Sequence, residues 1–342
     1  MGDYLSKRES GLELFRCFLM FLIVLWHCFR HGIFYDTFAN TDICILITVA
    51  LCWHVDGFVA ISGWFGIRFS MRKLLRLYGI IVFYSVVSTV AEISAGCAVG
   101  VTTFKISGGW FGDSYMALLL LSPLINASLD NLQVRPLLQA WLAFAVVATL
   151  TWMPGHLFCA TAAFGCASAS LFSLVFVYVT SRTFALCCLK LDEVPCLKKL
   201  LPFIKHWKVI VIIMFIAYAL VAYWAPRNRY FNMDWWACYY GPFVVCMALA
   251  MMKIFSQIRM SGMLERIVRC CAPSMFGVLL FHDVTYLGHL TINKMESYLA
   301  TSMSPTMTVV LSAIAIFLLG IIIDGSRRAL LNGVRLLWRK TV

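Results

Sequence analysis

The sequence predicts an all-α polytopic membrane protein with about ten transmembrane helices and both termini in the cytoplasm. Hydrophobic residues make up 62% of the 342-residue chain and charged residues 13%, whereas soluble globular domains carry about 25% charged residues. Apolar stretches of about 18 to 25 residues recur from end to end, and each is long enough to cross a bilayer. Basic residues gather on alternate connections between these stretches, which is typical of a membrane protein with a fixed orientation.

The apolar stretches predict ten spans in a single integral membrane domain over residues 1–342. The first carries Arg16 and His27 and lacks a small-residue cleavage site, so we expect it to remain as a helix. The fourth to sixth are crowded together, so their edges are the least defined. The spans cover residues 11–30, 43–67, 74–98, 113–128, 136–153, 156–180, 207–224, 236–254, 271–290 and 306–324.

The charge pattern predicts the orientation of the protein in the membrane. We expect a multi-pass protein of the plasma or inner membrane. When the amino terminus is placed in the cytoplasm, external segments hold few basic residues, namely Arg30, Lys105, Arg227, Arg229 and Lys294. Nearly all other Lys and Arg residues are then cytoplasmic, as the positive-inside rule requires. The net charge of +12 therefore reflects topology. No basic stretch outside the membrane is interleaved with aromatic residues, so nucleic acid is not an expected partner.

The fourteen cysteines predict neither a disulfide framework nor a metal site. None forms a C-x-x-C pair, and most lie within apolar stretches, where a free cysteine behaves as a small buried hydrophobe.

The first expected span places two ionisable side chains on one helical face. Arg16 and His27 are eleven residues apart, which is close to three helical turns and about 16 Å along the axis. An ionisable residue inside a membrane helix is costly and marks a functional site by default. One fixed cation and one titratable base suggest a long anionic ligand, held at one end and used at the other.

Structural roles are the alternatives for this pair. His27 could be a core histidine whose hydrogen bonds are satisfied, and Arg16 could extend to the nearby cytoplasmic interface. Within its own helix, only Glu13, one turn earlier, could neutralise Arg16.

Two further groups lie in and after the second span. Asp56 and Ser62 are polar at membrane depth, and Asp56 could orient a histidine on another helix or pair with a buried hydroxyl or cation. Arg68, Arg72 and Arg76 are spaced by four and form one stripe at the cytoplasmic surface. Their guanidinium groups match phosphate oxygens, although topology or lipid headgroups would equally explain them.

A last candidate lies in the ninth span. His282 and Asp283 are adjacent, so they diverge on a helix, but either could line a polar cavity from its outer side.

These residues resemble acyltransferase family 3 of integral membrane proteins, whose hallmark is an Arg and a His separated by ten residues in the first helix. Arg16 and His27 have this spacing. The chain departs from the family pattern at Gly79, where proline is usual, and at Leu279, where tyrosine is usual. Individually weaker resemblances follow in the family's order, at Phe58-Val-Ala-Ile-Ser-Gly-Trp-Phe, Arg72-Lys-Leu-Leu-Arg-Leu-Tyr, Trp110-Phe with Leu121-Ser-Pro-Leu-Ile-Asn, Phe276-Gly-Val-Leu-Leu-Phe-His-Asp and Ile323-Asp-Gly-Ser-Arg-Arg.

The resemblance implies transfer of an acyl group, commonly acetyl, from cytoplasmic acyl-coenzyme A to a sugar hydroxyl of a polysaccharide, lipid-linked glycan or glycolipid. Acyl-coenzyme A would be a co-substrate, with no permanently bound cofactor. Arg16, with Arg72 and Arg76, would engage its nucleotide end. His27 would act at the thioester as general base or transient acyl carrier. The expected supporting or cavity-lining residues are Asp56, Ser62, Trp110, His282 and Asp283.

Two other classes of protein share parts of this pattern. A polysaccharide polymerase or flippase is also polytopic and basic inside, but it usually has a large external loop or more spans. A secondary transporter favours broken helices in two repeats, and the chain has no convincing internal symmetry.

Overall fold

The computed structural model describes residues 10–35, 42–96, 106–157, 170–190, 206–224 and 239–341. Throughout these ranges the regular structure is helical and no strand is present, which confirms the all-α prediction. The chain forms two compact units. Unit 1 consists of residues 1–12, 40–75 and 110–259, and unit 2 consists of residues 13–39, 76–109 and 260–342.

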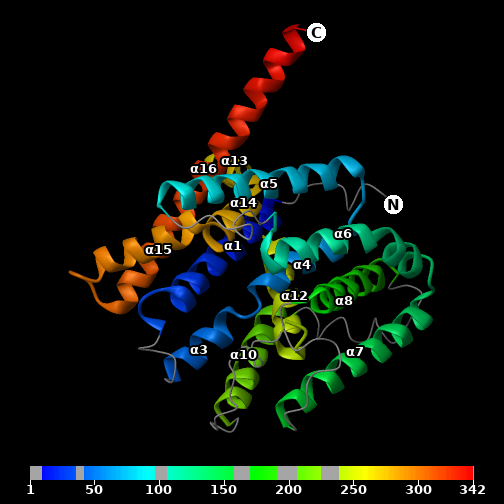
Figure 1. Cartoon of the computed structure of the whole chain (residues 1–342). Coiled ribbons are helices and arrows are strands. Elements are labelled where there is room, and N and C mark those ends of the chain that lie inside the picture. The colour runs from blue at the N-terminus through cyan, green and yellow to red at the C-terminus, as the bar shows by residue number, and fades with distance from the viewer. Residues whose placement is uncertain are drawn as a thin grey trace. The chain divides into compact units, whose positions relative to one another are not determined.

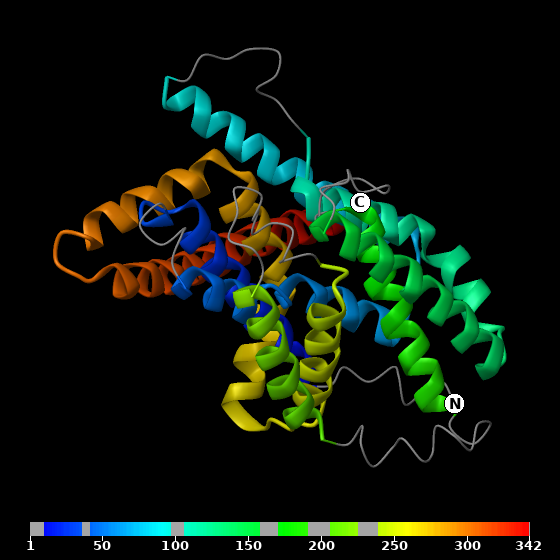
Figure 2. The same ribbon diagram turned by 90° about the horizontal axis from the view of Figure 1, so that it is seen from below.

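Unit 1 is built from helices in the middle of the chain. Helix α4 packs against α8, α10 against α12, and α7 against α8 (Figures 1 and 2). The helices are α3 (Asp42–Leu51), α4 (His54–Phe65), α6 (Gly109–Asp130), α7 (Val134–Leu157), α8 (Leu171–Leu189), α10 (Trp207–Trp224) and α12 (Pro242–Ser256).

Helices α4 and α8 approach closely because a glycine lies at their crossing. A Cβ atom at Gly63 would lie 2.5 Å from the carbonyl oxygen of Tyr178 and 2.9 Å from Cβ of Ser181. The Ser181 hydroxyl also donates a hydrogen bond to the carbonyl of Ala60 at 2.6 Å. Small residues and an interhelical hydrogen bond are the usual means by which membrane helices associate, since lipid gives no hydrophobic drive.

Polar contacts hold the turn after α4 against α6 and α8. The Asn126 amide donates to the carbonyl of Ile67, whose own N–H donates to the Tyr178 hydroxyl. Tyr178 in turn donates to Asn126. Nearby, Arg182 forms a two-pronged pair with Asp130, with both N–O distances 2.8 Å. A bidentate pair of this kind fixes orientation as well as adding energy.

Unit 2 combines most of the first helix with residues 76–109 and the last quarter of the chain. Helix α15 lies beside α16, and α14 packs on α16 (Figures 1 and 2). Most of α5 also belongs to this unit. The helices are α1 (Ser10–His31), α5 (Met71–Ser94), α13 (Gly262–Cys271), α14 (Met275–Leu279), α15 (Tyr286–Leu299) and α16 (Pro305–Thr341). A short 3-10 turn (Ala272–Ser274) precedes α14, and a π turn (Leu280–Val284) follows it.

A buried carboxylate anchors α14 to α16. Asp324 is fully buried and pairs with Arg327 at 2.8 Å and Arg328 at 3.4 Å. The Tyr84 hydroxyl on α5 also donates to it. A Cβ atom at Gly277 would collide with the Asp324 side chain, so only glycine allows this approach. The family motifs around Gly277 and Asp324 thus meet at one packing contact.

Helix α15 also holds the end of α1. The Ile33 N–H donates to a carboxylate oxygen of Glu296 at 2.8 Å, and Glu296 is fully buried. Burial raises the pKa of Glu296, while the hydrogen bond from Ile33 opposes that rise. The amino-terminal helix is therefore fixed at the end that carries His27.

The described residues include six helices long and apolar enough to cross a membrane, at Ser10–His31, Asp42–Phe65, Met71–Ser94, Leu171–Leu189, Gly262–Val284 and Pro305–Gly333. Shorter apolar helices occupy Val134–Leu150, Trp207–Tyr223 and Pro242–Ser256. The predicted segment 271–290 has the wrong bounds, because the helical stretch starts earlier, at Gly262, and breaks at Thr285, the N-cap residue before α15. Part of segment 156–180, at residues 158–169, lies outside the described residues.

The contact at Gly63 predicts a strong effect of one added methyl group. We expect Gly63→Ala to destabilise unit 1 by about 1–3 kcal/mol, because the obstacle is backbone and side chain of α8. The matched control is Gly79→Ala on α5, where a Cβ atom meets nothing within 4 Å. Thermal unfolding of both purified variants in detergent checks this. Equal melting temperatures would contradict the proposed packing.

Candidate active site

Helix α1 positions the two residues of the Arg–His motif, and both lie in unit 2. Their separation along the continuous helix is about 16 Å. Arg16 pairs with Glu13 one turn earlier, as its position in the sequence suggested. The Glu13 side chain is buried while that of Arg16 is 31% exposed. The guanidinium has five N–H donors, so this single pair leaves donors for an anionic ligand.

His27 lies beside the turn that follows α14. Its Nδ1 atom is 2.9 Å from Nε2 of His282 and 3.6 Å from a carboxylate oxygen of Asp283. His282 is fully buried, and its Nδ1 atom is 2.6 Å from the carbonyl oxygen of Val278. The predicted site residues His27, His282 and Asp283 are therefore brought together within one unit.

Adjacent residues diverge on a helix, yet His282 and Asp283 both reach His27. They lie in the π turn Leu280–Val284, a wider turn of a kind that is frequent at functional sites. Thr285 ends this turn, where its hydroxyl donates to the carbonyl of Phe281 and accepts from the N–H of Gly288. The π turn thus presents both side chains to the same ring.

The segment before Trp110 closes the other side of the π turn. Gly109 has a φ of +68°, in the left-handed region that favours glycine. A Cβ atom there would lie 3.1 Å from a methyl group of Val284 and 3.6 Å from the Asp283 carboxylate. Any larger residue would be strained and would press on this turn.

The hydrogen bonds fix which nitrogen of His27 is basic. A carbonyl oxygen only accepts, so Nδ1 of neutral His282 carries the proton and donates to Val278. Nε2 of His282 must then accept, which places the proton of neutral His27 on Nδ1. The lone pair of His27 is left on Nε2, which forms no hydrogen bond within the part of the chain described here. The His27 side chain is 14% exposed, so the ring is not sealed off.

Asp283 supplies a counter-charge for the protonated state of His27. When His27 takes a proton, the imidazolium finds a carboxylate 3.6 Å from Nδ1. A buried carboxylate beside a catalytic histidine stabilises the imidazolium in this way in known acyl-transfer sites. The site can therefore accept a proton at Nε2 and hold the resulting charge.

Sequence reasoning missed two histidines beside the site. The ring of His31 lies 5.5 Å from that of His27 and 6.3 Å from that of His289. Nε2 of His289 contacts the backbone carbonyl of Asp283 at 2.9 Å. The spacing of four between His27 and His31 is readable in the sequence, whereas the approach of His289 requires the fold. Within the described ranges, no group of three or more His, Cys, Asp or Glu side chains is arranged to hold a metal ion.

Three predicted supporting residues belong to unit 1, so their part in the site stays a prediction. Asp56 is buried, and its Oδ2 atom has no hydrogen-bond partner among the described residues. Ser62 donates to the carbonyl of Phe58 and is 3.1 Å from the Tyr115 hydroxyl. Trp110 stacks on Tyr239. Within unit 2 the carboxylate beside His27 is Asp283.

Arg72 and Arg76 are exposed and one turn apart on α5, as predicted. Arg68 lies in the non-helical segment before Met71, so the predicted helical stripe of three is wrong at Arg68. Arg72 belongs to unit 1 and Arg76 to unit 2. Their participation in the same site as Arg16 also stays a prediction.

Comparison with known proteins assigns the chain to a family. Neither curated proteins nor solved structures show a significant match to the chain. Residues 9–325 match a family model described as an acyltransferase domain, and this range covers α1, the π turn and most of α16. The chain belongs to acyltransferase family 3 and is a multi-pass membrane acyltransferase.

Proposed function

We propose that this acyltransferase moves an acyl group, most simply acetyl, from cytoplasmic acyl-coenzyme A to a sugar hydroxyl. The acceptor would be an extracytoplasmic polysaccharide, a lipid-linked glycan or a glycolipid. The proposal includes ten spans, cytoplasmic termini and a cell-membrane location, because these follow from the charge pattern. In this orientation Arg16 lies near the cytoplasmic supply of acyl-coenzyme A, and His27 lies toward the outer half of the bilayer.

The observation that carries the proposal is the chain of hydrogen bonds from Val278 through His282 to His27. It leaves the lone pair of His27 on Nε2, while the hydrogen bond at Nδ1, on the other side of the ring, fixes the orientation of the ring. General base catalysis needs such an atom within hydrogen-bond reach of the acceptor hydroxyl. Structural histidines usually have both nitrogens satisfied by the protein.

In the direct route His27 Nε2 removes the proton of the sugar hydroxyl as the oxygen attacks the thioester carbonyl. A carbon–oxygen bond forms, the carbon–sulfur bond breaks, and the departing thiolate takes the proton from His27. In the covalent route Nε2 itself attacks the carbonyl, the carbon–sulfur bond breaks, and coenzyme A leaves as the thiolate. The sugar hydroxyl then attacks the acyl carbon, the carbon–nitrogen bond breaks, and the hydroxyl proton passes through solvent to the thiolate. Asp283 stabilises the positive imidazole in either route. Rapid quench without acceptor separates the routes, because only the second gives a burst of coenzyme A.

Arg16 is suited to the phosphates of the co-substrate. It keeps its charge at any physiological pH, and its pair with Glu13 occupies only one of its N–H groups. The distance from Arg16 to His27 is comparable with the reach of the flexible arm that separates the nucleotide from the thioester. Arg72 and Arg76 would extend this anion-binding surface.

Removing the proposed base tests the function directly. We expect His27→Ala to abolish O-acylation of cell-surface glycans, measured by mass spectrometry and proton NMR, because no other group supplies the lone pair. The matched control is His206→Ala, an exposed histidine in unit 1. Unchanged O-acyl content in cells with correctly inserted His27→Ala protein would refute the proposal.

Removing the partner of His27 tests the orientation of the ring. We expect His282→Phe to lower kcat by about 10²–10⁴-fold with little change in KM for acyl-coenzyme A, because Nδ1 of His27 loses its acceptor. His282→Gln should recover part of the rate, since its amide oxygen can accept the same proton. Steady-state kinetics and the pH–rate profile provide the measurement. A rise in KM with kcat unchanged in both variants would show that His282 does not act through His27.

A further inference from the structure

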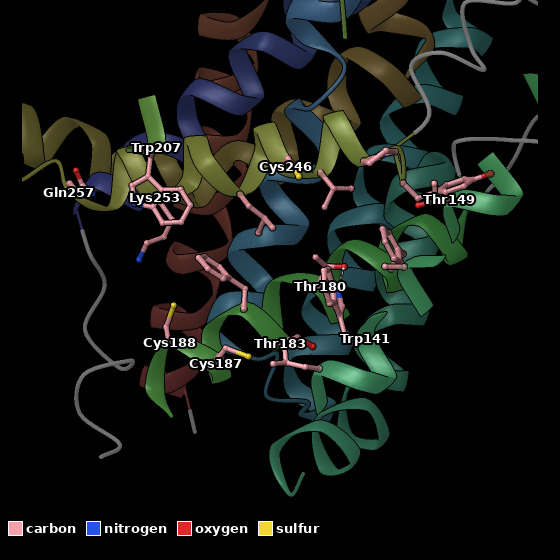
Figure 3. A pocket seen from close by; sticks show the side chains of 18 residues that line it. Trp141, Thr149, Thr180, Thr183, Cys187, Cys188, Trp207, Cys246, Lys253 and Gln257 are labelled. Carbon is pink, nitrogen blue, oxygen red and sulfur yellow. Dashed lines mark hydrogen bonds between the residues drawn. The ribbon is translucent and has the colours of Figure 1, made fainter. Parts of the chain in front are cut away.

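An elongated groove lies wholly within unit 1, between α7, α8, α10 and α12 (Figure 3). Its volume is about 630 Å³. Stripes of α7, α8 and α12 line it, and α10 contributes Trp207. Along α12 and its C-cap, the lining residues Pro242, Val245, Leu249, Lys253 and Gln257 are three or four positions apart. The groove therefore runs along the helices for about 22 Å, at about 1.5 Å per residue.

Charge and polarity change along the groove. Lys253, Gln257 and Trp207 lie together at one end in Figure 3, while Thr149 lies at the other end. Most of the remaining lining is aliphatic, aromatic or thiol, and the described residues that line the groove include no Asp or Glu. One end is therefore suited to an anion and the rest to hydrocarbon.

Lys253 has no acidic partner within the described ranges. Its ammonium group lies 4.3 Å from the ring centre of Trp64, and Trp64 packs on Phe184. Phe184 in turn packs on Trp207, the first residue of α10. These aromatic contacts hold the ammonium in place through cation–π attraction without neutralising it.

The charged end of the groove coincides with the ends of three helices. Cys187 and Cys188 lie in the last turn of α8, Trp207 begins α10, and Lys253 lies in the last turn of α12. Tryptophan and lysine at such a level are typical of the membrane–water interface. The apolar length beyond them faces the hydrocarbon, where one leaflet is about 15 Å thick, half of about 30 Å.

We propose that this groove binds one anionic phospholipid of the surrounding bilayer, with an acyl chain along the lining and its phosphate at Lys253 and Gln257. Basic pockets between membrane helices are known to bind anionic headgroups. Acyl-coenzyme A fits less well, because its several phosphates would meet one cation, Lys253, among the described lining residues. A helix from a second copy is about 10–12 Å wide and would need well over ~1,500 Å³ at this length.

The test uses the full-length protein purified in detergent, exchanged into phosphatidylglycerol or phosphatidylcholine. Thermal unfolding measures stabilisation by each lipid, and native mass spectrometry measures what remains bound. Lys253→Gln removes the headgroup contact at nearly constant volume, and Ala145→Phe fills the lined groove. The matched controls are Lys208→Gln, an exposed cation next to Trp207, and Ala140→Phe on the exposed face of α7.

We expect phosphatidylglycerol to bind several-fold better than phosphatidylcholine in the wild type and both controls. Lys253→Gln should lose this preference, Lys253→Arg should keep it, and Ala145→Phe should retain neither lipid. Circular dichroism establishes that the variants are folded. The proposal would be overturned if Lys253→Gln kept the wild-type preference for phosphatidylglycerol, or if folded Ala145→Phe retained lipid fully. A polyprenyl-linked glycan bound in place of phospholipid would also overturn it. None of these outcomes depends on acyl transfer.

Discussion

The hydrogen bond between His27 and His282 is the contact on which the rest of the account depends. It joins the first helix to the last quarter of the chain, and its 2.9 Å length leaves little freedom in how the two rings meet. Because Nδ1 of His282 donates to the carbonyl of Val278, this one backbone acceptor sets the donor and acceptor roles in both hydrogen bonds of the series Val278–His282–His27. A ring otherwise free to flip then has one basic nitrogen, Nε2 of His27.

Much of unit 2 serves to keep that contact in place. The π turn presents His282 and Asp283 together, and Gly277 lets α14 approach Asp324 on α16. Glu296 holds the backbone just beyond α1, so the His27 end of the helix does not drift from its partner. Catalytic geometry tolerates only small displacements, and supporting contacts of this kind are what fix it. Several residues that resemble family motifs thus have a structural role in supporting His27 and His282.

Helical class, membrane character and the Arg16–His27 pair could be predicted from the sequence, because apolar length and ionisable residues at membrane depth are local signals. The pair Arg16–Glu13 followed from spacing along one helix. The partnership of His27 with His282 did not, since 255 residues separate them and no periodicity links them. The end of the ninth segment was misplaced because apolar residues continue on both sides of Thr285, at Val284, Tyr286 and Leu287. The break at Thr285 comes from side-chain capping rather than from hydropathy.

The most direct test of the central claim is an experimental structure of the protein with a non-reactive thioether analogue of acetyl-coenzyme A. For the covalent route, the account predicts that the carbonyl carbon lies about 3–3.5 Å from Nε2 of His27. For the direct route, it predicts a gap between these two atoms that the acceptor hydroxyl can occupy. In both cases the phosphate oxygens should lie at Arg16. His282 should still contact Nδ1 on the far side of the ring. A carbonyl carbon of the analogue bound away from His27, or a flipped ring that turns Nδ1 toward the ligand, would contradict the account.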